Sequence, residues 1–210
     1  MKDIVILGGG GFAQEVAFLI EEINNDRKMY NILGFIEKEQ SCDNVESRGY
    51  PVLDESWLLK QNNICVALGI GNPVINLQLI EKLENKKFIY PNLVHPGAVC
   101  LSKKVKMGQG NIVCAGNIFT VNITIGSFNI FNLSSTYGHD VNISDFSVFN
   151  PGVKISGNVS VGKRCLIGVG AVVMQNVTIT DDVVIGAASF VHRSIEEKGT
   201  YFGVPAKKIK

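Results

Sequence analysis

The C-terminal half of the chain has an apolar residue at every sixth position, without a break, from Leu101 to Val191. The series contains sixteen residues in a chain that is only 46% apolar, so chance produces it with a probability of roughly four in a million. An α-helix repeats every 3.6 residues and a strand every two, so neither explains a period of six. Repetition of a fixed hexad instead predicts a solenoid built from short strands.

The other positions of the hexad fit a parallel β-helix of triangular cross-section. The residue four places after each apolar position is never charged or aromatic, which indicates a second interior row of restricted size. Gly or Asn often follows the apolar position, and both residues tolerate the left-handed backbone angles of a sharp corner. Three hexads make one coil, so the repeat predicts about five coils and a prism on the order of 24 Å tall.

The first ninety or so residues follow a different pattern, in which strand-like and helix-like segments alternate. We expect strands over 2–7, 31–36, 64–68 and 87–90, with a short edge strand over 48–53. Helices are expected over 13–23, 54–60 and 74–84, and Asp54 is the expected N-cap of the second. This order predicts a Rossmann-like domain in residues 1–92 and the β-helix in residues 93–210, with the linker at 91–97.

Composition excludes several classes of function. The net charge of +1 gives no electrostatic basis for binding nucleic acid or an acidic membrane surface. No stretch of eighteen apolar residues is present, so no membrane span is expected. The chain enters a strand at once, without the apolar segment of a signal peptide, which predicts a cytoplasmic protein. No C-x-x-C pair occurs, so we expect reduced, buried thiols at Cys42, Cys65, Cys100, Cys114 and Cys165.

A glycine-rich turn joins the first strand to the first helix. It consists of Gly8, Gly9, Gly10, Gly11 and Phe12. Such a turn lets a ligand approach the backbone and directs phosphates to the helix N-terminus. Glu37 ends the second strand, where a ribose-binding acid lies in dinucleotide folds. Ala13 takes the place of the third glycine of that fingerprint, so half a site, for one nucleotide, fits better; the alternative is a tight turn without a ligand.

A histidine beside a carboxylate is the second chemical motif. His139 follows an interior position by two residues, so it lies on a corner of the β-helix, and Asp140 is next to it. An adjacent acid can orient an imidazole for general-base work near neutral pH, although a corner histidine can also be merely solvated. His95 is expected to be structural and His192 to lie on the surface. These two repeat-region histidines, 139 and 192, are too few for a three-histidine zinc site, so no metal is expected.

The chain as a whole resembles a known family of enzymes. The hexapeptide repeat, the His139–Asp140 pair and the terminal segment Gly203–Lys207 are similar to those of the left-handed β-helix acyltransferases. Over residues 2–208 the chain resembles the bacterial sugar acetyltransferases of the bacillosamine-pathway and sialic acid O-acetyltransferase type. That branch joins a small nucleotide-binding βαβ domain with a Gly-rich turn to a left-handed β-helix.

The resemblance implies a role for particular residues. It makes His139 the general base and Asp140 the residue that orients it, with Asn132 near the acceptor. It places the backbone amide of Gly157 on the carbonyl of the acetyl thioester. Coenzyme A contacts are implied at Val169, Gly170, Ala187, Pro205, Ala206 and Lys207. Sugar-nucleotide contacts are implied at Gly8, Gly9, Gly10, Gly11, Phe12, Glu37, Gly71 and Asn72. Some members of the family have histidines where this chain has Phe12 and Val148.

The resemblance also implies a reaction. Acetyl-CoA donates its acetyl group directly, without a covalent intermediate or a metal, in a homotrimer whose active sites lie between subunits. The favoured acceptor is the 4-amino group of a UDP- or dTDP-linked amino-deoxysugar, used in surface glycans such as O-antigen, capsule or lipopolysaccharide. O-acetylation of sialic acid or a related sugar is the second hypothesis. The third is a non-catalytic β-helix protein that binds a sugar nucleotide.

Overall fold

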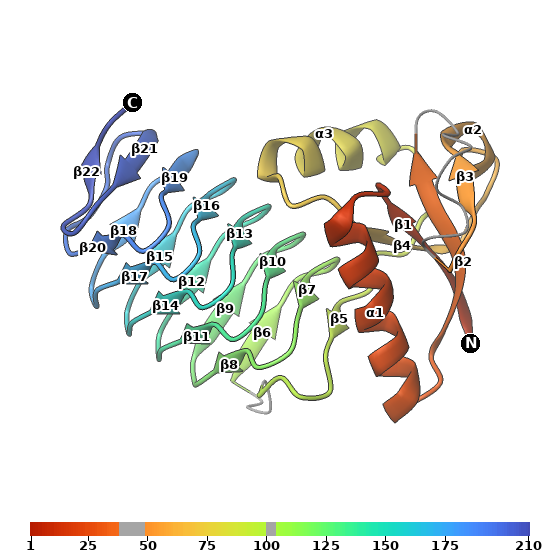
Figure 1. Ribbon diagram of the computed structural model, residues 1–210, viewed down its shortest axis with the longest axis horizontal. Coiled ribbons are helices and arrows are strands. Elements are labelled where there is room, and N and C mark those ends of the chain that lie inside the picture. Colours follow the sequence, from red (N-terminus) through yellow and green to blue (C-terminus); the bar gives the residue numbers. More distant parts are fainter. Residues whose placement is uncertain (38–48, 100–103) are drawn as a thin grey trace.

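The structure is a computed structural model that describes residues 1–37, 49–99 and 104–210. Figure 1 shows an α/β unit at the N-terminal end and a triangular stack of short strands that runs from it to the C-terminus. Several sequence-based expectations lie outside the described residues: the repeat position at Leu101, the thiols of Cys42 and Cys100, and the start of the expected edge strand at Arg48.

The N-terminal unit is a four-stranded parallel sheet in the order β3-β2-β1-β4. Its strands are β1 (Lys2–Leu7), β2 (Tyr30–Glu37), β3 (Val52–Asp54) and β4 (Cys65–Leu68). The helices interleaved with them are α1 (Gly11–Asp26), α2 (Glu55–Leu58) and α3 (Pro73–Leu83). Asp54 caps α2 by accepting a hydrogen bond from the Ser56 amide, as predicted. This arrangement confirms the predicted Rossmann-like sheet. No helix in the described part of the chain is long and apolar enough to cross a membrane.

The strand expected over 87–90 is wrong. Within the described residues, this segment forms an isolated bridge at Ile89 with Cys65, in which the Ile89 carbonyl accepts from the Val66 amide and the Ile89 amide donates to the Ile64 carbonyl. The chain then reaches Pro91, which has no amide hydrogen for a strand ladder and ends the pairing. The segment expected to be a linker instead contributes β5 (Leu93–Val94), which pairs with the β-helix strand β7.

Three faces of short strands make up the C-terminal unit. The first face contains β5, β7 (Ile112–Val113), β10 (Ile130–Phe131), β13 (Val148–Phe149), β16 (Leu166–Ile167), β19 (Val183–Ile185), β21 (Gly199–Phe202) and β22 (Lys207–Lys208). The second face contains β8 (Ile118–Phe119), β11 (Thr136–Tyr137), β14 (Lys154–Ile155), β17 (Val172–Val173) and β20 (Phe190–Val191). The third face contains β6 (Val105–Met107), β9 (Ile123–Ile125), β12 (Asn142–Ile143), β15 (Ser160–Val161) and β18 (Thr178–Ile179).

Strand pairing confirms three hexads per coil. Ile130 pairs with Val148, and Val148 with Leu166, so each strand lies on the one eighteen residues earlier. In the described residues, the second and third faces have five strands each and the first has more, so the fold is confirmed and the coil count differs slightly from the five predicted. The first face has eight, because β5 starts the coil that contains β6 and the antiparallel pair β21–β22 adds two strands at the C-terminal end.

The interior of the prism is packed in columns. Phe119 stacks on Tyr137 at 4.5 Å and Phe131 on Phe149 at 5.2 Å, and each pair is eighteen residues apart. A polar column of Asn111, Asn129, Ser147 and Cys165 satisfies the corner amides of successive coils. Buried amides need such partners, because an unpaired polar group in the interior costs free energy. This column is the hexad position four residues after each apolar residue, and its packing explains why only small or medium-sized, uncharged residues occur there.

The first face also carries the N-terminal unit. Outward side chains of β7, β10 and β13, namely Ile112, Ile130 and Val148, are buried in one hydrophobic cluster with the residues of α1 and the sheet. Phe12 packs against the same cluster. Phe12 and Val148 are therefore both apolar side chains of the cluster that joins the two units.

The chain turns from the first to the second face, then to the third, and back to the first, so the prism has three edges. The first edge includes residues 132–135, 150–153, 168–171 and 186–189. The second edge includes residues 120–122, 138–140, 156–158 and 174–176. The third edge includes residues 126–128, 144–146, 162–164 and 180–182.

Candidate active site

His139 and Asp140 lie together on the second edge. Nδ1 of His139 is 2.7 Å from Oδ2 of Asp140. A proton on Nδ1 satisfies the carboxylate, which leaves the lone pair of Nε2 free to accept a proton. Hydrogen bonding with His139, and next with Asn122, lowers the pKa of Asp140. Asp140 is therefore ionised at neutral pH. The His139 side chain is 62% exposed, so an acceptor can reach it from solvent.

Gly157, in the next coil, makes room for the imidazole. A Cβ atom placed on Gly157 would be 2.5 Å from Nε2 of His139, closer than real contacts allow. The backbone of this coil also holds the histidine, because the Asn158 amide donates to the His139 carbonyl at 2.8 Å. In the described part of the chain no acceptor takes the Gly157 N–H. A base and a free amide donor thus lie side by side, the combination that acyl transfer requires.

The residues expected to contact coenzyme A gather on the first edge. Val169 and Ala187 are eighteen residues apart in one column, and both are exposed. The Ala188 amide donates to the Val169 carbonyl, and the Gly170 amide to the Pro151 carbonyl. The terminal segment returns to this edge, where the Gly203 amide donates to Ser189 Oγ and the Ala206 amide to the Phe190 carbonyl. Pro205 and Lys207 are exposed at its C-terminal end.

Asn132 also lies on the first edge, not beside His139. Its Oδ1 accepts from the Leu133 amide at 2.8 Å, and its own carbonyl accepts from Asn117 Nδ2. The second face separates this edge from the second edge, so a single chain does not bring Asn132 or the expected coenzyme A contacts together with His139.

A cavity of about 530 Å³ lies at the carboxyl ends of β1, β2 and β4. Ligands of parallel α/β sheets bind at this end of the strands. Gly8, Gly9 and Glu37 line it, three of the expected sugar-nucleotide residues. Gly8 has φ +98°, and a Cβ there would be 2.8 Å from Ile70 Cγ1, so the turn requires glycine. Gly10, the N-cap of α1, leaves the first helical amides without a side-chain partner.

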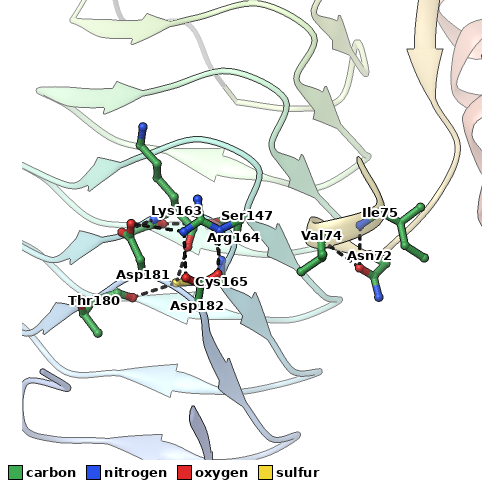
Figure 2. Close-up of polar contacts among 11 residues, drawn as sticks. Asn72, Val74, Ile75, Ser147, Lys163, Arg164, Cys165, Thr180, Asp181 and Asp182 are labelled. Carbon is green, nitrogen blue, oxygen red and sulfur yellow. Dashed lines mark hydrogen bonds and ion pairs between the residues drawn. The ribbon is translucent and has the colours of Figure 1, made fainter. Parts of the chain in front are cut away.

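The other expected sugar-nucleotide residues are placed differently. Gly10, Gly11, Phe12, Gly71 and Asn72 do not line the cavity. Asn72 is the N-cap of α3, and its Oδ1 accepts from the amides of Val74 and Ile75 at 3.0 and 3.1 Å (Figure 2). Its side-chain oxygen is thus engaged in capping the helix.

The far wall of the cavity is formed by residues that no sequence motif predicts. Glu55 of α2 and Gln78 and Lys82 of α3 line it, and Lys82 Nζ is 2.5 Å from the Glu55 carboxylate. Their positions depend on how α2 and α3 pack, which no local motif in the sequence specifies. The helical spacing of Gln78 and Lys82, four residues apart, was the only available signal that they share a face.

Free thiols are present but not nucleophilic. Cys65, Cys114 and Cys165 are free and buried, as predicted. Burial raises the pKa of the Cys114 thiol to about 12 and that of Cys165 to about 11. These groups stay protonated near neutral pH, so neither supplies a thiolate for a covalent intermediate.

The third edge is a structural ladder of charges. Arg164 donates through Nε and Nη2 to the two carboxylate oxygens of Asp182 at 2.7 and 2.8 Å (Figure 2). Asp181 and Lys163 extend the cluster, in which the Lys163 amide donates to Asp181 Oδ1. These contacts join successive coils and lie on a different edge from His139.

The fold and the site together define a class of protein: a β-helix with an imidazole–carboxylate pair on one corner, attached to an α/β unit with a cavity at the carboxyl ends of its strands. Residues 3–83 match the family model described as the PglD N-terminal domain. A search of curated proteins finds no match.

Solved structures extend the likeness over the whole chain. The acetyltransferase domain of PglB from Neisseria gonorrhoeae FA1090 is 28% identical, with a TM-score of 0.88 and coverage of 100% of both chains. PerB from Caulobacter crescentus, in complex with CoA and GDP-perosamine, is 29% identical, with a TM-score of 0.85 and coverage of 100% of this chain and 98% of PerB. WeeI from Acinetobacter baumannii AYE is 27% identical, with a TM-score of 0.86 and coverage of 100% of both chains. The predicted resemblance to left-handed β-helix sugar acetyltransferases is confirmed.

Proposed function

We propose that this protein transfers the acetyl group of acetyl-CoA to the 4-amino group of a nucleotide-linked amino-deoxysugar. The observation that carries the proposal is the His139–Asp140 pair, held on a rigid corner beside the Gly157 amide. A protein similar over the full chain is described as a perosamine N-acetyltransferase in complex with CoA and GDP-perosamine, which supports an amine acceptor. We assign nucleotide binding to residues 1–92 and acetyl transfer to residues 93–210.

His139 acts as the general base in this proposal. The acceptor enters as a neutral amine, and its nitrogen attacks the carbonyl carbon of the thioester while Nε2 takes the proton from that nitrogen. The carbonyl electron pair moves to oxygen, where the Gly157 N–H donates to the developing charge. The C–S bond then breaks, and the departing sulfur of coenzyme A takes the proton from His139. Asp140 stabilises the imidazolium between these two steps.

A complete site requires a second copy of the chain. The expected coenzyme A contacts lie on the first edge and His139 on the second, with the second face between them. That face exposes apolar side chains, among them Ile118 at 42% and Val172 at 37%. We propose a homotrimer in which the first edge of one chain meets the second edge of its neighbour, because a cyclic arrangement places each edge against its complement.

An acceptor panel tests the proposed reaction. Coenzyme A release and product mass are measured with GDP-, UDP- and dTDP-linked 4-amino-6-deoxysugars and with free sialic acid. N-acetylation is supported if an acetylated amino sugar forms in an amount equal to the coenzyme A released and its acetyl group resists hydroxylamine, which cleaves esters but not amides. The accepted substrate then identifies the nucleotide. Acetylation of sialic acid alone moves the protein to the O-acetyl hypothesis. Failure to bind acetyl-CoA at all leaves the non-catalytic hypothesis.

Mixed trimers test whether the site is shared. His139→Ala removes the base, and Val169→Glu places a charge on the exposed first edge. When the two inactive variants are unfolded and refolded together, about a quarter of the sites combine an intact second edge with an intact first edge. We expect activity to return to about that fraction of wild type. Refolding each variant alone is the control. A mixture as inactive as its components contradicts a shared site.

A further inference from the structure

We propose that Asn122 is a positioning residue for the catalytic base: it fixes the Asp140 carboxylate, and that carboxylate fixes the His139 imidazole. The side-chain hydrogen bond of Asn122 goes to Asp140 and not to the imidazole, so its effect on the base passes through Asp140. The inference rests on the proposed function for its catalytic meaning. Its structural content, the orientation of the imidazole, can be measured in the protein without any substrate.

A chain of two hydrogen bonds connects the three side chains. Asn122 Nδ2 donates to Asp140 Oδ1 at 3.0 Å. The other carboxylate oxygen, Oδ2, lies 2.7 Å from Nδ1 of His139. The side-chain amide of Asn122, in the preceding coil, holds one oxygen of the Asp140 carboxylate. The carboxylate therefore cannot rotate freely, and its second oxygen stays directed at the imidazole. Both groups are exposed, so without Asn122 water would compete for the carboxylate and free it to turn.

The backbone brings Asn122 to this place. Asn122 and Asp140 are eighteen residues apart on the second edge, and both have left-handed backbone angles, φ +57° and +60°. The Asp140 amide donates to the Val121 carbonyl at 3.0 Å, which fixes the spacing of the two coils. Asn and Asp are among the few residues that tolerate this conformation, so the corner selects for them and places their side chains one above the other.

The same column contains a matched pair that serves as an internal comparison. Asn158 and Asn176, also left-handed, are joined by a hydrogen bond of 2.7 Å from Asn158 Nδ2 to Asn176 Oδ1. Side chains along the second edge therefore pair two by two. In the first pair, the acceptor is the Asp140 carboxylate, whose second oxygen is hydrogen-bonded with His139. Among the described residues, only the first pair has a side-chain hydrogen bond to the imidazole, whereas Asn158 contacts His139 through its backbone amide alone, so the two pairs separate a catalytic effect from corner stability.

The test compares three variants of the second edge. Asn122→Gly removes the side chain and keeps the left-handed backbone accessible. Asn122→Asp keeps the shape but replaces the donor with a second carboxylate. Asn176→Gly is the control, because it removes an equivalent side-chain ladder contact that involves neither the imidazole nor Asp140 and leaves the backbone amides in place. In ¹⁵N-labelled protein, the NMR signals of the imidazole nitrogens report the tautomer of His139. The protein has three histidines, and the signals of His139 are those that disappear in the His139→Ala variant.

Wild-type protein should keep the neutral His139 protonated at Nδ1. In both Asn122 variants we expect a mixture of tautomers, and a fall in kcat of about tenfold, as for loss of one charge-assisted hydrogen bond, with both KM values within about twofold. The Asn176→Gly control should leave the nitrogen spectrum and kcat unchanged. If Asn122→Gly fails to fold, Asn122→Asp, which preserves the side-chain shape, still provides the measurement.

Two results would overturn the proposal. One is a His139 nitrogen spectrum that does not change in either Asn122 variant. The other is an equal change in the Asn176→Gly control, which would mean that general rigidity of the edge sets the imidazole. Because the spectra are recorded without substrate, they decide the role of Asn122 even if the wild-type protein acetylates no acceptor, which would count against the proposed function alone.

Discussion

Gly157→Ala should disable the enzyme without unfolding it. The new Cβ would lie 2.5 Å from Nε2, 2.6 Å from Cε1 and 3.0 Å from Cδ2 of His139, and these are its three nearest atoms. The imidazole is exposed and is held by a hydrogen bond with Asp140, which is weaker than the hydrogen-bonded backbone of the coils, so the ring yields before the backbone does. Gly157 does not have a left-handed φ, so alanine is tolerated there. The substitution also keeps the N–H that is proposed to bind the oxyanion.

The expected loss follows from the displacement. Contact at ordinary van der Waals distance requires the ring to move by about 1 Å, and a misplacement of that size costs on the order of 10²-fold in rate. This corresponds to about 2.7 kcal/mol in the activation barrier. We would measure kcat and KM by coenzyme A release, and the melting temperature by calorimetry. The melting temperature should stay within a few degrees of wild type.

A double-mutant cycle tests the reasoning. In a His139→Ala background the ring is gone, so adding Gly157→Ala should lower kcat by less than about twofold. Effects that multiply, with a further loss of about 10²-fold in the double variant, would refute the argument that Gly157 acts through the imidazole. So would a fully active Gly157→Ala single variant.

Three further predictions concern other parts of the chain. Asn72→Ala should lower the free energy of unfolding by about 1 kcal/mol through loss of the α3 cap, measured by urea denaturation, with Asn72→Asp as a capping control. Asp182→Asn should lower it by about 0.5 kcal/mol at pH 7, a small value because the pair with Arg164 is partly exposed. Hydrogen bonding with Arg164 lowers the pKa of Asp182, so this contribution is present above the unfolded pKa of about 3.9 and disappears as pH falls through the folded value; an effect that persists at pH 2 would contradict it. Leu79→Trp should fill the cavity of the N-terminal unit and weaken nucleotide-sugar binding by more than about tenfold in calorimetric titration, while acetyl-CoA binding stays unchanged.

The sequence predicts the β-helix in detail because each position of the hexad has the same structural environment in every coil. Every coil places its apolar residue against the one eighteen positions earlier, so one rule fixes strands, corners and register. The corner position of His139 and its contact with Asp140 follow from that rule. The contact with Gly157 follows too, although the steric need for glycine is visible only in the packed structure.

Non-local packing accounts for what the sequence does not reveal. Lys87–Tyr90 has the composition of a strand, but in the described residues its pairing with β4 is limited to a bridge at Ile89 before Pro91 ends it. Asn72 resembles a ligand-binding residue after a glycine, yet its position one residue before Pro73 makes it a helix cap. Glu55 and Lys82 meet because α2 and α3 pack together, a contact between residues far apart in sequence.

The role of His139 is tested most directly by single-turnover acetyl transfer in the His139→Ala variant, with acetyl-CoA and the accepted amino sugar both saturating. A general base contributes about 10²–10⁴-fold, so we expect the transfer rate to fall by that factor while acetyl-CoA affinity and the melting temperature stay unchanged. A His139→Ala variant that transfers acetyl at a rate within about threefold of wild type would contradict the account.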